Sequence, residues 1–450
     1  MNPVPWDLPA PEAGLASLPN AAGMGPGELA ALMASLGEPA WRSQQIFKGL
    51  LQQRWTRWEL FSNLPKALRA RLEAEVVLRW PTILQSQPSA DGSTKHVFEL
   101  GDGSQVEGVY MPYVVRGPGL RPTPPEPPRQ GQAEPSPGNA LRGSGLRPTP
   151  PEPPRQGQAE PSPGNALRGS GLRPTPPEPP RQGQAEPSPG FDNDKLERVT
   201  LCLSSQVGCA MGCTFCATGQ MGIIRNLNAG EIVGQVVAML NHHWHPPDRP
   251  VNLVFMGMGE PLHNFDHLMA AFSILSDRAG LAIPPRRITV STSGLVSGID
   301  RLGTHARRPR LALSLNATTD QHRSRIMPVN RAWNLEALAQ SLGRFPLQSG
   351  ERITLEYVLL KGVTDSLEDG RRLAAFARHF PAKVNLIPFN PHEGSGFEPP
   401  DEARIGALCR LLSEAGLPVS VRRSRGQDVA GACGQLVRHG RSPKPLKSEV

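Results

Sequence analysis

The sequence lacks several features that would place the protein at a membrane or outside the cell. It contains no run of 18 apolar residues that could cross a bilayer, and its N-terminus lacks the basic-then-apolar pattern of a secretion signal. Only 6 cysteines occur in 450 residues, which argues against a disulfide framework. Lysine is also scarce, since 40 of the 48 basic residues are arginine. We therefore expect a cytoplasmic protein with no membrane partner.

Positive charge, in contrast, is in excess. The formal net charge is +8 and the isoelectric point is about 9.5. This balance favours contact with a polyanion, most simply nucleic acid, although a compositional bias of the genome toward arginine is an alternative. A chain of this length can bury at least one large core.

A direct repeat with a period of 26 residues interrupts the chain. Its copies begin at Gly119, Gly145 and Gly171, and together they hold 21 of the 50 prolines and no aromatic residue. Such a composition cannot bury enough apolar area to offset the entropy of ordering, so we expect a disordered insertion over residues 118–192. A tolerated expansion and a proline-rich docking segment are the two interpretations of its role.

The segments on both sides of the insertion have the pattern of β-strands, so it is expected at the tip of a hairpin-like connection. The organisation that we predict has six parts: a flexible N-terminus (1–25), a helical accessory unit (26–80), a β extension (81–117), the insertion (118–192), a core with a C-terminal catalytic loop (193–438) and a flexible tail (439–450). The helical unit is either an RNA-binding domain or a plain helical cap.

After residue 200 the pattern alternates between strand and helix. Apolar strand candidates begin at Leu201, Val251, Arg287, Leu311, Ile353 and Val384, and one intervening helix begins at Asn228 with a capping-box pattern. Six apolar strands separated by helices predict parallel pairing, and hence an α/β fold with a partial (β/α)6 barrel. In such folds the chemistry gathers at the carboxyl ends of the strands.

Three cysteines with the spacing C-x3-C-x2-C follow the first of these strands. Cys209, Cys213 and Cys216 can bind one inorganic centre from a single loop. A zinc site would need a fourth ligand, whereas a 4Fe–4S cluster held by three cysteines leaves one iron open. The spacing resembles the signature of the radical S-adenosylmethionine (SAM) superfamily, in which the open iron binds SAM. A chance trio or a zinc loop is the alternative.

Polar residues stand at the ends of several predicted strands. Gly259 and Glu260 follow the second strand, where a glycine allows close approach of a ligand and a carboxylate can accept a hydrogen bond from an ammonium group. The other candidates for contacts with SAM are Ser291, Ser314, Leu315, Asn316 and Asn390.

Three further cysteines lie outside the cluster loop. Cys202 lies on a predicted strand, Cys409 lies on an amphipathic helix as a small buried hydrophobe, and Cys433 lies in a glycine-rich loop suited to an accessible nucleophile.

Together these motifs resemble one family over nearly the whole chain, the dual-specificity RNA adenine-C2 methyltransferases called RlmN. The matching segments include Asp91-Gly-Ser-Thr-Lys, Gly257-Met-Gly-Glu-Pro and Ala432-Cys-Gly-Gln-Leu. The repeat insertion departs from the family pattern, and Asn316 stands where many members have histidine. The resemblance implies a monomeric enzyme that binds a 4Fe–4S cluster and SAM, accepts electrons from a flavodoxin-like donor, and methylates 23S rRNA and tRNA.

The resemblance also implies a role for three side chains. Cys433 accepts a methyl group from one SAM, and a radical derived from a second SAM activates that methyl for addition to adenine C2. Glu107 then removes the C2 proton. Cys202 attacks the sulfur of Cys433, and a transient disulfide releases the methylated RNA.

Two rival hypotheses remain at this point. One is the related enzyme class that methylates adenine C8 with the same cysteines. The other is a non-enzymatic zinc-containing RNA-binding protein, in which His242, His243 and His245 complete the metal site. These histidines follow a predicted helix, where a solvated position is the simpler expectation.

Overall fold

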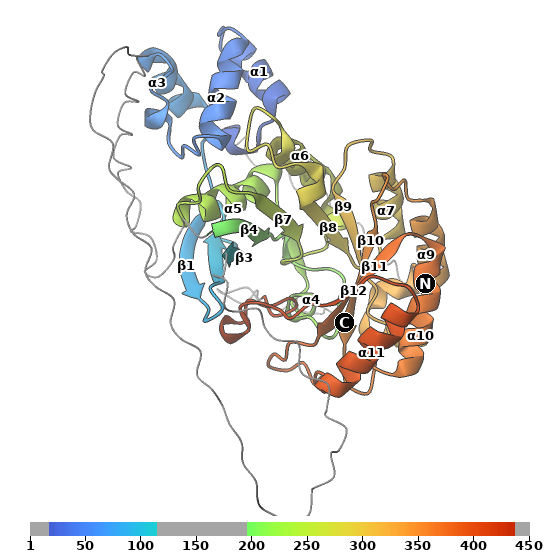
Figure 1. Cartoon of the computed structure of the whole chain (residues 1–450). Coiled ribbons are helices and arrows are strands. Elements are labelled where there is room, and N and C mark those ends of the chain that lie inside the picture. Colours follow the sequence, from blue (N-terminus) through green and yellow to red (C-terminus); the bar gives the residue numbers. More distant parts are fainter. Residues whose placement is uncertain (1–17, 115–195, 437–450) are drawn as a thin grey trace, which may run out of the picture. The chain divides into compact units, whose positions relative to one another are not determined.

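A computed structural model describes residues 18–114 and 196–436 of the chain. The first described elements are the helices α1 (Pro26–Ser35), α2 (Trp41–Leu51) and α3 (Lys66–Glu75), drawn in blue in Figure 1. A proline opens α1, and the Glu28 side chain accepts the Gly25 amide, so the first turn is capped. The helical prediction for this region is confirmed.

The central sheet has ten strands among the described residues. Seven of them are parallel: β4 (Leu196–Cys202), β7 (Val251–Phe255), β8 (Ile288–Thr292), β9 (Arg310–Ser314), β10 (Ile353–Leu359), β11 (Ala382–Pro388) and β12 (Val419–Val421). The six predicted strands and the α/β class are therefore confirmed. Strand β12 was missed because three residues with a central serine give almost no periodic signal.

An antiparallel extension continues the sheet from β4. It consists of β1 (Thr82–Pro88), β2 (Thr94–Glu99) and β3 (Gln105–Val114), and β3 pairs with β4 so that Val109 lies opposite Cys202 and Val114 opposite Leu196. The two strands that flank the insertion thus pair as the hairpin-like connection requires. The predicted disorder of residues 118–192 lies outside the described residues.

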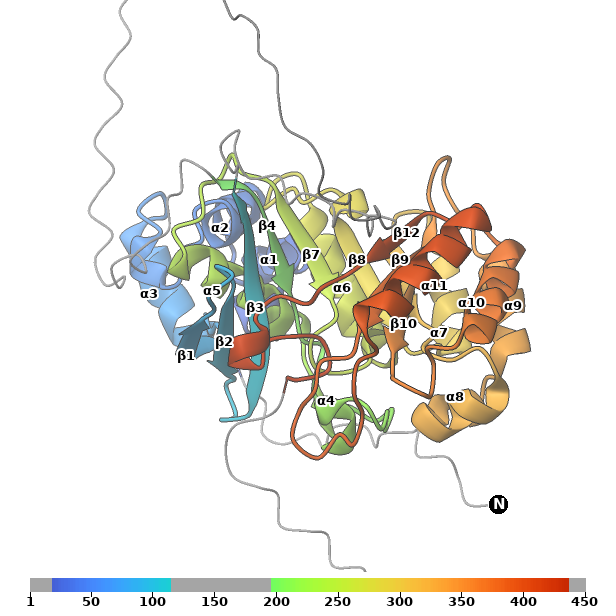
Figure 2. The same cartoon turned by 60° about the horizontal axis from the view of Figure 1, so that its bottom comes forward.

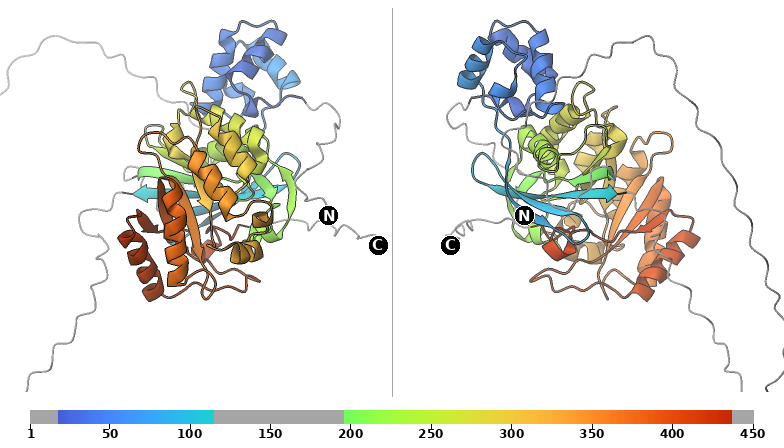
Figure 3. Two further views of the ribbon diagram at one scale, coloured as in Figure 1. Left: turned by 90° about the vertical axis from the view of Figure 1, so that its right-hand side faces the viewer. Right: turned by 60° about the vertical axis from the view of Figure 1, so that its left-hand side comes forward.

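Helices cover the outer face of the curved sheet, as the two views of Figure 3 show. They are α5 (Ala229–His242), α6 (Phe265–Ser276), α7 (Val296–Gly303), α9 (Leu335–Arg344), α10 (Leu367–Phe376) and α11 (Glu402–Glu414). The short helix α8 (Asp320–Ile326) lies apart from them, and its Ile326 carbonyl accepts the Thr214 amide. The predicted capping box at the start of α5 is present, because Asn228 and Glu231 each accept the other's amide. No helix in the described ranges has the length and apolar character needed to span a bilayer.

The other face of the sheet meets two loops. One contains the short helix α4 (Ala217–Gln220) and a ribbon of β5 (Gln206–Gly208) and β6 (Ile223–Asn226). The other is the C-terminal segment after β12. Figure 2 shows the red C-terminal segment beside α4, and the Ala217 amide donates to the Gly434 carbonyl at 2.8 Å.

Candidate active site

The three clustered cysteines lie in the loop around α4. Cys209 directly follows β5, and Cys216 is the N-cap residue of α4. A glycine is required inside this loop, because a β-carbon at Gly219 would come within 2.9 Å of the Cys213 amide nitrogen. The close backbone path brings all three thiols to one wall of a pocket.

The donor set fits an iron–sulfur cluster better than a single zinc ion. A structural zinc site takes four protein ligands, usually cysteine and histidine. Among the described residues, the pocket is lined by the three clustered cysteines and by no histidine, and a 4Fe–4S cluster needs only cysteine thiolates. Burial raises the pKa of Cys209 to about 12 and also raises the pKa of Cys213 and Cys216, so the thiolates need a bound cation.

The pocket has a cavity volume of about 170 Å3 and lies at the carboxyl ends of the parallel strands. Besides the three clustered cysteines, seven of the residues singled out in the sequence line the pocket: Gly259, Glu260, Ser291, Ser314, Asn316, Asn390 and Cys433. Leu315 does not line the pocket, since its side chain is buried in the core and its amide donates to the Glu356 carbonyl. Residues from five strands thus meet in one cavity because parallel strands end at the same edge.

Backbone amides hold the Glu260 carboxylate at the pocket wall. One carboxylate oxygen accepts the Leu262 amide at 3.1 Å and the other accepts the Ser293 amide at 2.7 Å. Burial raises the pKa of Glu260, and the bonds from Ser293 oppose that effect. Gly259 has a φ of 101°, and a side chain there would overlap that of Gln206. The loop therefore presents a fixed acceptor where the backbone can approach a ligand closely.

The polar residues on β8 and β9 form a second side of the pocket. The hydroxyl oxygens of Ser291 and Ser314 lie 3.2 Å apart. Asn316 has a φ of 57°, a left-handed conformation that asparagine tolerates. Its side-chain oxygen accepts the Val358 amide at 3.0 Å, and its nitrogen lies 3.4 Å from the Met327 sulfur. Asn316 therefore braces the end of β9 against β10.

Asn390 holds the loop that contains Cys433. Its side-chain nitrogen donates to the Cys433 carbonyl at 3.2 Å and to the Ser424 hydroxyl at 2.9 Å, and its oxygen accepts from Gln427 at 2.9 Å. Farther along the loop, the Thr218 hydroxyl of α4 donates to the Leu436 carbonyl. These bonds position Cys433 next to the cluster loop.

Cys202 and Cys433 share a second, smaller pocket. Cys202 is buried at the end of β4, whereas Cys433 is half-buried and lines both this pocket and the larger one. Burial raises the pKa of Cys202, the nearby Cys433 thiol adds to the rise, and the Arg422 guanidinium opposes it. All six cysteines are free thiols.

Glu107 forms a buried ion pair. The Lys95 ammonium lies 3.1 Å from its carboxylate, and the two side chains are 3 % and 0 % exposed. In the β3–β4 register, Val109 lies opposite Cys202, so Glu107 is two residues along on the same face of the sheet. Glu107 does not line either of the two pockets described above.

Sequence reasoning missed two residues of this region, Lys95 and Arg422. Arg422 follows β12, lines both pockets and lies 3.7 Å from the Glu356 carboxylate. The position of Arg422 directly after a strand could have indicated a role at the pocket, but strand β12 was not predicted from the sequence. Lys95 lies in a segment that resembles the family, yet only the pairing of β2 with β3 makes it the partner of Glu107.

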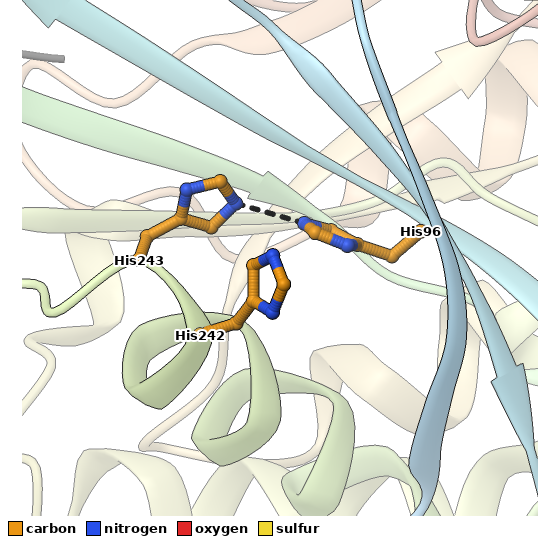
Figure 4. Close-up of side chains that lie close together, drawn as sticks. All are labelled: His96, His242 and His243. Carbon is orange, nitrogen blue, oxygen red and sulfur yellow. Dashed lines mark hydrogen bonds between the residues drawn. The ribbon is translucent and has the colours of Figure 1, made fainter. Parts of the chain in front are cut away.

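The prediction that His242, His243 and His245 lie at a solvated helix end is wrong. His245 is 2 % exposed, and His242 and His243 are half-buried beside His96 of β2 (Figure 4). Burial lowers the pKa of His243 to about 3 and that of His245 to about 4. None of these histidines lines the cysteine pocket, so they do not complete a metal site there.

Comparisons with known proteins cover most of the chain. Residues 203–374 match the model of the radical SAM superfamily, and residues 19–78 match that of the ribosomal RNA large subunit methyltransferase N-terminal domain. The chain is 37 % identical to a probable dual-specificity RNA methyltransferase RlmN of Koribacter versatilis, over 90 % of this chain and 98 % of that protein. It is 38 % identical to RlmN 2 of Myxococcus xanthus, over 90 % of this chain and 86 % of that one.

A solved structure is similar over nearly the same range. The radical SAM methyltransferase of Sphaerobacter thermophilus is 33 % identical, with a TM-score of 0.71, and the match covers 93 % of this chain and 99 % of that one.

Proposed function

The chain belongs to the RlmN family of radical SAM RNA methyltransferases, and we propose that it methylates C2 of an adenosine in 23S rRNA and of the adenosine next to the anticodon in tRNA. The observation that most supports this proposal is the placement of Cys433. Its thiol lines the pocket of the three cluster cysteines and, on another side, the pocket of Cys202. A simple polar methyltransferase has no use for such an arrangement.

The 4Fe–4S cluster and SAM are the cofactors of this family. Cys209, Cys213 and Cys216 would hold the cluster, and the pocket wall around Glu260 and Ser291 would hold SAM. When bound, they would supply the methyl group and the one-electron chemistry that removes a hydrogen atom from an unactivated methyl and later takes up the single electron released as the C2 adduct loses its proton. Such chemistry is needed because adenine C2 is electron-poor and has no lone pair with which to attack a methyl donor.

The chain's own residues then act in sequence. Cys433 receives the methyl group on its sulfur, and the carbon of that methyl becomes bonded to adenine C2. The Glu107 carboxylate removes the C2 proton. The Cys202 thiolate attacks the Cys433 sulfur, forming a sulfur–sulfur bond as the sulfur–carbon bond breaks, and the released carbon takes up a proton.

Two neighbouring side chains support these roles. The Arg422 guanidinium lies beside both thiols and opposes the burial that raises the pKa of Cys202, which favours the attacking thiolate. Asn390 fixes the loop backbone at Cys433 through its bond to the carbonyl. The methyl-bearing sulfur is thereby held between the cofactor pocket and the resolving thiol.

The partners follow from the same proposal. The net charge of +8 suits an RNA substrate. We further propose that the enzyme is a cytoplasmic monomer that receives its electrons from a flavodoxin-like protein.

Separate replacement of the two thiols tests the proposal. Cys433→Ala lacks the methyl acceptor and should form neither product nor adduct with RNA. Cys202→Ala should accumulate a covalent protein–RNA adduct through a methylene at Cys433, and Glu107→Ala should stall at a similar adduct. Cys409→Ala, a half-buried thiol on α11, is the matched control and should turn over normally.

Denaturing gels and mass spectrometry of the cluster-loaded enzyme with tRNA and with rRNA fragments measure the adduct. Wild-type turnover by Cys202→Ala, with no protein–RNA adduct, would overturn the assigned roles.

A further inference from the structure

A cluster of three histidines lies on the side of the sheet extension that takes no part in the proposed reaction. His96 lies on β2, His242 is the last residue of α5 and His243 is its C-cap. One ring nitrogen of each lies within 4.8 Å of the other two, and no other group of three His, Cys, Asp or Glu side chains in the described ranges is so close. Figure 4 shows the three rings turned toward one another.

We propose that His96, His242 and His243 bind a divalent transition metal, with Zn2+ as the best match. Three imidazole nitrogens plus a water molecule complete the tetrahedral set that zinc prefers. Imidazole ligands in a site without carboxylates also disfavour Mg2+ and Ca2+. This inference rests on no part of the proposed methyl transfer.

The distance between two of the three rings, those of His96 and His243, needs little change for a metal to enter. The Nε2 atoms of His96 and His243 lie 2.8 Å apart and share one hydrogen bond. Zinc at about 2.0–2.1 Å from each nitrogen separates two tetrahedral ligands by roughly 3.3 Å. The rings therefore move apart by only about half an ångström when the metal replaces the shared proton.

Neighbouring side chains already orient the rings. The Ser86 hydroxyl lies 2.9 Å from His96 Nδ1, the ring nitrogen opposite the one that faces His243, and 3.3 Å from His242 Nε2. The Tyr110 ring stacks on His243 with a centroid distance of 3.7 Å. A hydrogen bond to the second nitrogen of a metal-bound histidine is the usual way in which its orientation is set.

The position of the three histidines determines how a metal ion would reach them and which elements it would join. His96 is 0 % exposed, whereas His242 and His243 are half-buried, which leaves a path from solvent. The metal would join the end of α5 to β2, and Lys95, the residue before His96, forms the ion pair with Glu107. The site would thus clamp the strand that supports Glu107 to the core.

The test uses the full-length protein with its iron–sulfur cluster loaded, so that the three cysteines are occupied. After treatment with a chelating resin, the protein is titrated with Zn2+ by calorimetry. We expect one tight site, a higher melting temperature with Zn2+, and an X-ray absorption spectrum with Zn–N distances of about 2.0–2.1 Å and no Zn–S shell at about 2.3 Å.

Variants then assign the ligands. His243→Ala should weaken Zn2+ binding by more than about 100-fold, and Ser86→Ala, which removes an orienting bond, by about 10- to 100-fold. His242→Asn, at a half-buried position, keeps the test valid if His243→Ala fails to fold. His267→Asn, at an exposed position on α6, is the control and should bind as the wild type does.

Two results would overturn the proposal. One is equal Zn2+ affinity in the wild type and in His242→Asn or His243→Ala. The other is a zinc spectrum dominated by sulfur, which would place the ion at cysteine thiols.

Discussion

The buried pair of Lys95 and Glu107 allows a quantitative test of how burial sets the strength of an ion pair. The two side chains are 3 % and 0 % exposed, and the ammonium and carboxylate lie 3.1 Å apart. Lys95→Met keeps most of the aliphatic stem but removes the cation from beside a buried carboxylate. Removal of one partner of such a pair costs about 3–5 kcal/mol, a large part of a total stability of about 5–15 kcal/mol.

A matched control exists on the surface. Lys361 and Glu398 lie 3.4 Å apart, but their side chains are 62 % and 74 % exposed. Because solvent screens exposed pairs, Lys361→Met should cost at most about 1 kcal/mol. The double variant Lys95→Met/Glu107→Gln should recover most of the loss, since neither charge of this pair then remains buried.

Urea unfolding followed by circular dichroism measures the stability of the wild type and of the four variants, the fourth being Lys95→Arg. Lys95→Arg keeps the cation and should restore part of the stability. This variant tests whether the loss in Lys95→Met comes from the missing charge or from any substitution at this position. If Lys95→Met were as stable as Lys361→Met, the argument that burial strengthens the pair would be refuted.

Three further predictions concern the catalytic loop and the insertion. Burial raises the pKa of Cys202, and Arg422→Met removes the cation that opposes this rise, so the protein–RNA adduct should persist longer than in the wild type. Resolution of the adduct should quicken with rising pH as thiolate forms, by about tenfold per unit. Time courses of adduct decay from pH 7 to 9 measure this, and a decay that does not depend on pH would contradict it. Asn390→Leu removes three hydrogen bonds that hold the Cys433 loop. It should reduce methylation of Cys433 more than about tenfold, as measured by mass spectrometry, while the cluster is retained. Normal methylation would show that the loop is held by other contacts. Replacement of residues 118–190 by a short turn should leave folding and methylation nearly intact, because β3 and β4 already pair as a hairpin. Loss of soluble protein or of activity would assign the segment a structural or binding role.

Local patterns in the sequence were sufficient for the scaffold. The apolar strands, the capping box at Asn228 and the alternating pattern of each strand beside the insertion depend on residues within a few positions of one another. The C-x3-C-x2-C spacing likewise lies within one loop. Such features are readable because their physical causes, namely side-chain periodicity, capping and loop geometry, act over short distances along the chain.

Only the tertiary structure decided which distant residues meet. The pairing of β2 with β3 puts Lys95 against Glu107, and the short strand β12 brings Arg422 to both thiols. The packing of α5 against the sheet extension buries His242 and His243 beside His96, where the sequence indicated a solvated helix end. Strand order, register and helix packing follow from the burial of the whole core, and no local pattern in the sequence encodes them.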